Sequence, residues 1–180
     1  MDYSAIVKEI ISQYKLPLFG RHGLSHWARV WEGGLKLASE TGADQEVVRL
    51  FALFHDARRE NERRDDGHGK RGAELLTRFR GELVILTDHQ FDMLFYACVH
   101  HTDGMTEGDV TVQTCWDSDR LDLGRIGVRP NPRFLCTDAA KEASMISWSM
   151  ERSRILYAPP LIQTEWGIAS PIYEKNSPFP

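Results

Sequence analysis

Histidine and aspartate residues recur along the chain in a pattern that could bind a metal ion. His26 opens an apolar-periodic stretch, the adjacent pair His55 and Asp56 ends another, and Asp119 lies in the run CWDSDRLD. Imidazole nitrogens and carboxylate oxygens are the usual ligands of hydrolytic metal ions. Because a surface histidine needs no carboxylate beside it, the pattern predicts a metal-dependent hydrolase.

Each of these residues also has an ordinary structural interpretation. His55 and Asp56 could form a simple hydrogen-bonded pair, since a buried aspartate needs a partner. His26 could be a core histidine beside Trp27. The aspartates of DSDRLD could cap a helix, a role that suits Asp117 in particular. The order of the residues along the chain favours the metal-binding interpretation over these alternatives.

That order resembles the signature of the HD superfamily of metal-dependent phosphohydrolases, which is a His, a consecutive His-Asp and a later Asp. The matching segments are LSHWARV, ALFHDARRE and DSDRLDLG, and the resemblance covers roughly residues 21–129. It implies that His26, His55, Asp56 and Asp119 bind the metal ion, with Asp117 as the fallback for Asp119.

Further histidines match a subset of the superfamily that binds two or more ions. In that subset a loop histidine and a later HH doublet contribute ligands, and His68, His100 and His101 stand at such places here. We expect His68 and at least one member of the doublet in the pocket, binding a second ion or a substrate phosphate.

His22 lies four residues before His26, where the cyclic-dinucleotide branch of the superfamily has a ligand. Gly23 and an expected helix cap at Ser25 argue against a shared helix face for the two histidines. The GYP-like run of that branch is also missing after Gly104. We therefore do not assign the chain to that branch, and we expect one divalent ion (Mn, Fe, Co, Ni, Zn or Mg) rather than two.

Acid-base and substrate-binding candidates follow the His-Asp pair. Nucleotidase-like members of the superfamily carry a glutamate shortly after that pair, and Glu60 is the nearest candidate here, with Asp56 as the catalytic ligand. Guanidinium groups suit phosphate binding. The basic candidates for the substrate are Arg58, Arg59, Lys70, Arg71 and Arg120. The alternative for RRENERRDD is a solvated run of charges.

Length and composition limit the other function classes. The 180 residues are 42% hydrophobic and 27% charged, an ordinary globular balance for one domain with an appendage. The formal net charge of −4 gives no reason to expect general nucleic-acid binding. Cys98, Cys115 and Cys136 form no CxxC motif, so we expect free thiols and a cytoplasmic location. Neither a signal peptide nor a membrane span is expected.

Apolar periodicity predicts helices throughout. We expect one from His26 to Glu40 capped by Ser25, and one capped by Asp44 that ends near His55. Later helices are expected over 70–80, 88–101, 117–126 and 138–156, with a brief extended segment or small hairpin near Val110 to Val112. The predicted fold is an all-α, compact bundle of six or seven helices with the metal site in its core. Residues 1–157 form the domain and 158–180 a Pro-rich arm.

The expected function is hydrolysis of a phosphoester or phosphoanhydride bond in a nucleotide or another small phosphorylated metabolite, through a metal-activated water. An HD-type di-iron oxygenase and a catalytically silent, nucleotide-binding regulatory module are the alternatives. Expected partners are the small substrate alone, with no membrane and no general nucleic-acid binding. The sequence leaves homo-oligomer formation open.

Overall fold

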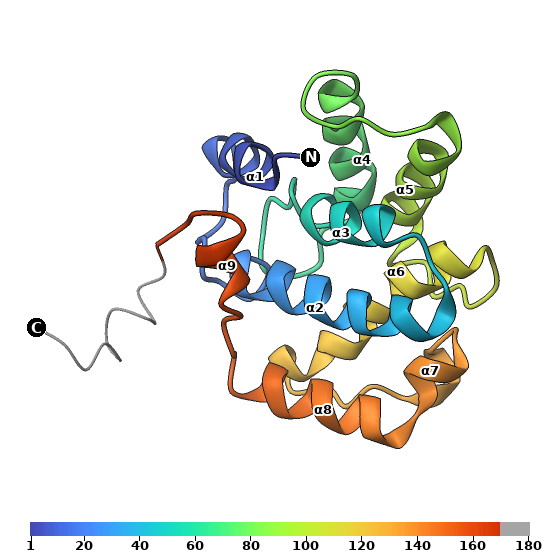
Figure 1. Cartoon of the computed structure of the whole chain (residues 1–180). Coiled ribbons are helices and arrows are strands. Elements are labelled where there is room, and N and C mark those ends of the chain that lie inside the picture. The colour runs from blue at the N-terminus through green and yellow to red at the C-terminus, as the bar shows by residue number, and fades with distance from the viewer. Residues whose placement is uncertain (170–180) are drawn as a thin grey trace, which may run out of the picture.

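The protein is all-helical, as the computed structural model of the chain shows for residues 1–169, the part described (Figure 1). Within these residues there are nine α-helices, two short 3-10 helices and no strand. The helices are α1 (Tyr3–Ser12), α2 (Leu24–Thr41), α3 (Gln45–Phe54), α4 (His68–Phe79), α5 (Asp88–His100), α6 (Val110–Leu121), η1 (Asp122–Ile126), η2 (Pro132–Phe134), α7 (Asp138–Lys141), α8 (Ala143–Arg154) and α9 (Leu161–Thr164). The predicted all-α fold is confirmed, with the one-turn helix α9 in addition.

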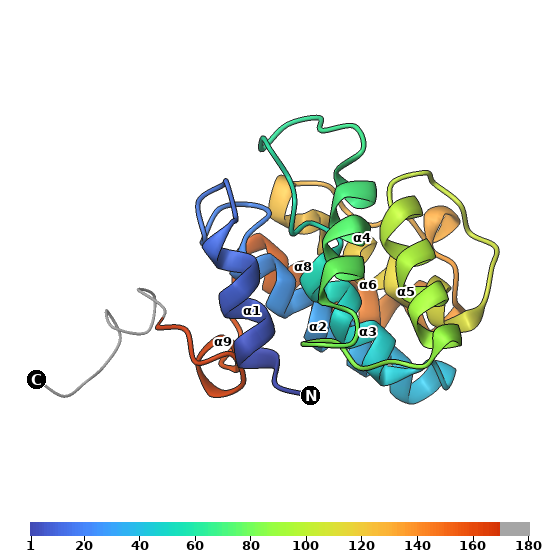
Figure 2. The same ribbon diagram turned by 90° about the horizontal axis from the view of Figure 1, so that it is seen from above.

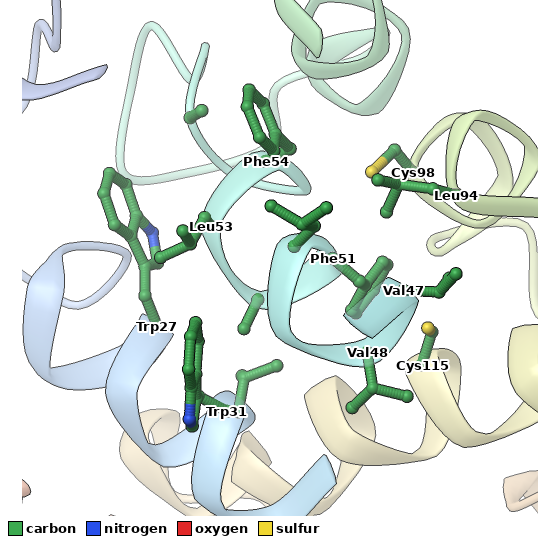
Figure 3. Packing of buried hydrophobic residues seen from close by; sticks show 14 of the residues in the cluster. Trp27, Trp31, Val47, Val48, Phe51, Leu53, Phe54, Leu94, Cys98 and Cys115 are labelled. Carbon is green, nitrogen blue, oxygen red and sulfur yellow. The ribbon is translucent and has the colours of Figure 1, made fainter. Parts of the chain in front are cut away.

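Helix α3 is the centre of the bundle. Every residue from Val47 to Phe54 except Arg49 is buried, and a helix that is apolar around its whole circumference has to lie in a core. Figure 3 shows α3 between α2 on one side and α5 and α6 on the other, with Trp27 and Cys98 reaching it from opposite sides. The pair His55–Asp56 directly follows this buried helix, so the fold carries both residues into the interior.

Helix starts agree with the predicted caps in one case and differ in another. The Asp44 side chain accepts hydrogen bonds from the backbone N–H groups of Glu46 and Val47, as expected for the cap of α3. Helix α2 instead begins after Gly23, and Ser25 lies inside its first turn. The expectation of a Ser25 cap was therefore wrong, and His26 is the third residue of the helix.

Helix α6 corrects the largest error in the expected elements. The segment from Val110 to Val112 is the first turn of a helix and not an extended strand or hairpin, because Asp109 caps it by accepting a hydrogen bond from Thr111 N at 2.8 Å. Burial of the apolar face of α6, including Trp116, outweighs the weak helix propensity of β-branched residues. The helix starts seven residues earlier than expected, so Asp119 lies in its last turn.

Helix α4 approaches its neighbours unusually closely. A Cβ atom at Gly72 would lie 2.2 Å from the backbone oxygen of Phe54, and one at Gly69 would lie 2.2 Å from the backbone oxygen of Cys98. Only glycine permits such contact between backbones. This packing places His68, the first residue of α4, beside the ends of α3 and α5.

The C-terminal part of the described chain packs onto the bundle. The helix expected over residues 138–156 is interrupted at Glu142, whose ψ of 132° is extended, and so forms α7 and α8. Beyond it, Ile162 and Trp166 are fully buried, and the ring of Trp166 lies 5.9 Å from that of Trp31. Four residues of the expected arm, Ala158, Leu161, Ile162 and Trp166, therefore belong to the core, and residues 170–180 lie outside the described part of the chain.

Two expectations about the whole chain can be compared with these residues. Cys98, Cys115 and Cys136 are all free, as expected, and the first two are buried. No helix among residues 1–169 has the length and apolar composition that crossing a bilayer would require.

Candidate metal centre

Helix ends bring six histidine and aspartate side chains to one place in the core. His26 comes from the first turn of α2 and Asp119 from the last turn of α6, while the other four flank the ends of α3, α4 and α5. The four flanking residues are His55, Asp56, His68 and His101. Backbone groups at helix ends are free of intrahelical bonds, so adjacent side chains there can turn toward a shared point.

The first cluster contains the four ligands implied by the family signature. His26 Nε2 lies 3.1 Å from His55 Nε2 and 3.6 Å from Asp56 Oδ2. Asp119 Oδ1 lies 3.5 Å from His26 Nε2 and 3.9 Å from His55 Nε2. The side chain of Asp119 is 16% exposed while the other three are 2% exposed or less, so this cluster meets solvent at Asp119.

The second cluster uses the other oxygen of the same aspartate. Asp56 Oδ1 lies 3.1 Å from His68 Nε2 and 3.8 Å from His101 Nε2, and the two imidazole nitrogens are 2.9 Å apart. Asp56 therefore presents one carboxylate oxygen to each cluster. A carboxylate placed between two groups of histidines is suited to bridging two metal ions.

The hydrogen bonds on the outer side of each imidazole fix which nitrogen carries the proton. In all four rings Nδ1 lies 2.6–3.0 Å from an oxygen that can only accept. The pairs are His26 with Asp122 Oδ2, His55 with Phe51 O, His68 with Asp65 O and His101 with Cys98 O. In the neutral rings Nδ1 is therefore the donor, and all four Nε2 lone pairs point toward the carboxylates.

This donor set fits divalent metal ions. Lone pairs and carboxylate oxygens converge, and Asp119 Oδ1 is buried without a hydrogen-bond partner. Acceptors packed at 2.9–3.9 Å need cations between them. Ligands at about 2.1 Å from an ion lie roughly 3.0–3.4 Å from one another, which is close to the observed spacings. His26, His55 and Asp56 could hold one ion, with Asp119 facing the same two histidines, and Asp56, His68 and His101 could hold a second.

Burial and neighbouring charges shift the pKa values of these candidate ligands. It lowers the pKa of His55 to about 4 and holds that of His26 well below its usual value, so both rings are neutral at pH 7, as metal ligands must be. Burial would raise the pKa of Asp56, but the surrounding imidazoles, His55 foremost, outweigh it and keep that pKa well below its usual range. Burial would likewise lower the pKa of His101, but the interaction with Asp56 and the negative charge of Asp119 raise it.

These shifts predict that the metal-free protein loses stability in mild acid. Between pH 6.5 and about 4 the unfolded chain binds a proton at His55 that the folded protein does not, so lowering the pH favours unfolding. His26 acts in the same direction and His101 in the opposite one. Urea unfolding in the presence of a chelator should give a smaller free energy of unfolding at pH 4.5 than at pH 7. A free energy that rises toward pH 4.5 would contradict this prediction.

An outer layer of charges that sequence reasoning missed supports the first cluster. Asp122 accepts the Nδ1 proton of His26 at 2.7 Å and receives two hydrogen bonds from Arg29 at 2.7 and 2.9 Å. Arg125 Nη2 lies 3.6 Å from Asp119 Oδ1, and its Nη1 is buried without a hydrogen-bond partner. Asp122 follows Asp119 by three residues in DSDRLD, and this spacing was the feature of the sequence from which its place beside the cluster could have been predicted.

A second missed feature is the pairing of His22 with Glu62. His22 Nδ1 lies 2.6 Å from Glu62 Oε2, and the rings of His22 and His26 are 6.2 Å apart. Figure 2 shows why residues so distant in sequence meet, since the loop after α3 arches beside the loop that follows α1. Burial lowers the pKa of His22, so Glu62 holds a neutral ring with its proton on Nδ1.

Several other predicted site residues have partners elsewhere. Asp117 accepts hydrogen bonds from Cys136 N and from the N–H and hydroxyl of Thr137, so it anchors the chain before α7. His100 pairs with Asp103 at 2.7 Å on the half-buried side of α5. The exposed Glu60 pairs with Lys15 at 2.7 Å. Neither candidate cluster includes any of these three predicted residues.

Four of the five basic candidates also have contacts away from the two clusters. Arg58 donates to Gln13, Lys70 pairs with Glu74, Arg71 donates to Asp65 and Arg120 donates to the backbone oxygens of Phe134 and Met105. Arg59 differs, because its Nη1 lies 3.4 Å from Asp56 Oδ1 and 3.2 Å from His68 Nε2. Of the five basic candidates, Arg59 is therefore the one that the structure places against the second cluster.

The fold and the site together define an all-helical protein with a buried histidine–aspartate cluster suited to divalent metal. The sequence profile of the HD domain family matches residues 23–131, a span from the start of α2 to the chain just before η2. The chain therefore belongs to the HD domain family. Comparison with curated proteins and with solved structures gave no match.

Proposed function

We propose that this HD domain protein is a metal-dependent phosphohydrolase that acts on a nucleotide or another small phosphorylated metabolite. The observation that carries the proposal is the convergence of four Nε2 lone pairs on Asp56 and Asp119. Divalent ions bound by such ligands polarise a phosphoryl oxygen and lower the pKa of water. Family membership supports the same class of chemistry.

We propose two ions and not the single ion that the sequence favoured. The reason is that Asp56 Oδ2 faces His26 and His55 while Oδ1 faces His68 and His101, which gives two candidate groups. Sequence reasoning favoured one ion because His22 is poorly placed as a ligand, and His22 does pair with Glu62. The second group instead uses His68 and His101, with no need of His22.

The charge of the centre supports an anionic substrate. The ion pairs around the clusters join three aspartates to three arginines, so these charges cancel when the imidazoles are neutral. The aspartates are Asp56, Asp119 and Asp122, and the arginines are Arg29, Arg59 and Arg125. Divalent ions would therefore make the site positive, and a positive, water-poor site favours phosphate groups.

Proton transfer is proposed for His22. Because Glu62 holds the proton on Nδ1, the Nε2 lone pair of His22 can accept a proton from an attacking water. Arg59 and Arg125 approach the two clusters and are the proposed contacts for phosphate oxygens. We infer a cytoplasmic location because Cys98 and Cys115 are buried free thiols.

The experiment is a phosphate-release screen on protein of measured metal content. Purified protein is loaded with Mn²⁺, Fe²⁺, Co²⁺, Ni²⁺, Zn²⁺ or Mg²⁺ and tested on nucleotides and phosphomonoesters, with chelated protein as the control. Phosphate release that depends on the metal supports the proposal. An iron-loaded protein that consumes oxygen and releases no phosphate favours the di-iron oxygenase. Nucleotide binding without turnover under every metal favours the regulatory module.

The HH doublet provides a matched pair of variants. His101→Ala removes a ligand of the second cluster, so we expect it to weaken second-ion binding and to lower turnover about a hundredfold or more. His100→Ala removes a ring that pairs with Asp103 outside the clusters. It should leave second-ion binding and turnover nearly unchanged. Metal titration and steady-state kinetics measure the difference. Equal effects of the two substitutions would contradict the second ion site.

A further inference from the structure

Among the described residues, Arg59 is the one arginine or lysine whose side chain contacts the candidate ligand atoms of the second cluster. Its Nη1 lies 3.2 Å from His68 Nε2 and 3.4 Å from Asp56 Oδ1. His68 Nδ1 donates to Asp65 O, so Nε2 is an acceptor and Arg59 is the donor in this contact. The guanidinium thus uses the same lone pair that an ion would need.

The rest of the guanidinium is held by the loop between α3 and α4. Arg59 Nη2 donates to the backbone oxygen of Arg63 at 2.6 Å and Nε to that of Asn61 at 3.4 Å. Its side chain is only 9% exposed. Arg59 also stands three residues after Asp56, and the turn between them is closed by a hydrogen bond from Arg59 N to Asp56 O at 3.2 Å. The contact is therefore built into the fold and is not a chance contact of a surface side chain.

Among residues 1–169 no equivalent contact is made to the first cluster. Arg125 approaches Asp119 at 3.6 Å, but the structure gives it no contact with the Nε2 atoms of His26 or His55. Both Nε2 lone pairs of the first cluster are therefore free of arginine donors. The two clusters should differ in how readily they take an ion, although they share Asp56.

We propose that the Arg59 guanidinium and the second metal ion compete for His68 Nε2, so that Arg59 weakens the second ion site relative to the first. This inference rests on the proposed metal centre. Binding of the second ion requires Arg59 to release His68 Nε2, because that nitrogen has a single lone pair, which cannot serve a hydrogen bond and a metal bond together. The released guanidinium could then bind a phosphate oxygen.

The test is a titration of chelator-treated protein with Mn²⁺, followed by calorimetry and by the paramagnetic resonance signal of a coupled manganese pair. Arg59→Met removes the donors and the charge while keeping a similar length. We expect its second Mn²⁺ to bind about tenfold tighter or more, the effect of losing a charge-assisted competitor. The control is Arg58→Met, which changes the neighbouring side chain bound to Gln13 and should leave both affinities as in the unaltered protein.

Each outcome has a distinct meaning. A second Mn²⁺ that binds Arg59→Met no tighter than the unaltered protein would overturn the competition while leaving the metal centre intact. Failure of the unaltered protein to bind any Mn²⁺ would overturn the metal centre itself, and the competition with it. Should Arg59→Met not fold, Arg59→Lys decides, because it keeps the charge but loses the forked donors. Its second ion should also bind tighter, and unchanged or weaker binding would contradict the proposal.

Discussion

Replacing Asp56 by alanine is expected to weaken the binding of both metal ions and to reduce phosphate release by about a thousandfold or more. The reason is that Asp56 is shared by the two clusters, with Oδ2 facing His26 and His55 and Oδ1 facing His68 and His101. No other aspartate in the described chain occupies such a position between the two groups. Metal content, metal affinity and turnover of the purified variant are the measurements.

Asp66→Ala is the matched control, because Asp66 lies in the nearby loop with its side chain 77% exposed and paired with Arg64. It should keep full metal content and turnover. An Asp56→Ala protein that retained both ions and full activity would contradict the shared-ligand arrangement. Loss of only the second ion in that variant would show that His26, His55 and Asp119 suffice for the first.

The largest expected effect on stability is at Gly72. Gly72→Ala places a Cβ 2.2 Å from the backbone oxygen of Phe54, so α4 has to move away from α3. We expect a loss of about 2–3 kcal/mol in the free energy of unfolding, despite a helix-propensity gain of about 1 kcal/mol for alanine over glycine. Displacement of α4 would also move His68, so the second ion should bind more weakly. Urea unfolding and Mn²⁺ titration measure the two effects.

Gly33→Ala is the control for this prediction. Gly33 also lies inside a helix, but the nearest atom to an added Cβ is a Trp148 ring carbon at 3.9 Å, an ordinary contact. Here alanine should raise the free energy of unfolding by about 0.5–1 kcal/mol through helix propensity alone. If both variants were destabilised alike, or if Gly72→Ala were as stable as the unaltered protein, the close approach of α4 to α3 would be contradicted.

The sequence by itself determined the helical class of the fold and pointed to the four residues that the structure gathers in the first cluster. Apolar periodicity depends on local spacing, so it predicted the helix that follows Asp44 and ends near His55 without knowledge of its neighbours. The order of His26, His55, Asp56 and Asp119 predicted residues that the structure brings together, because the chemistry of a metal site restricts its residue types. Asp44 at the start of α3 was likewise readable from sequence.

Tertiary structure decided what depends on the direction of side chains and on burial. Successive residues on a helix point about 100° apart, so only the packing of α5 could select His101 for the second cluster and leave His100 beside Asp103. The start of α6 depended on burial of Trp116, which outweighed local propensity. Local patterns gave no sign that Arg59 would turn inward while Arg58 bound Gln13, because long-range contacts settle the orientation of long charged side chains.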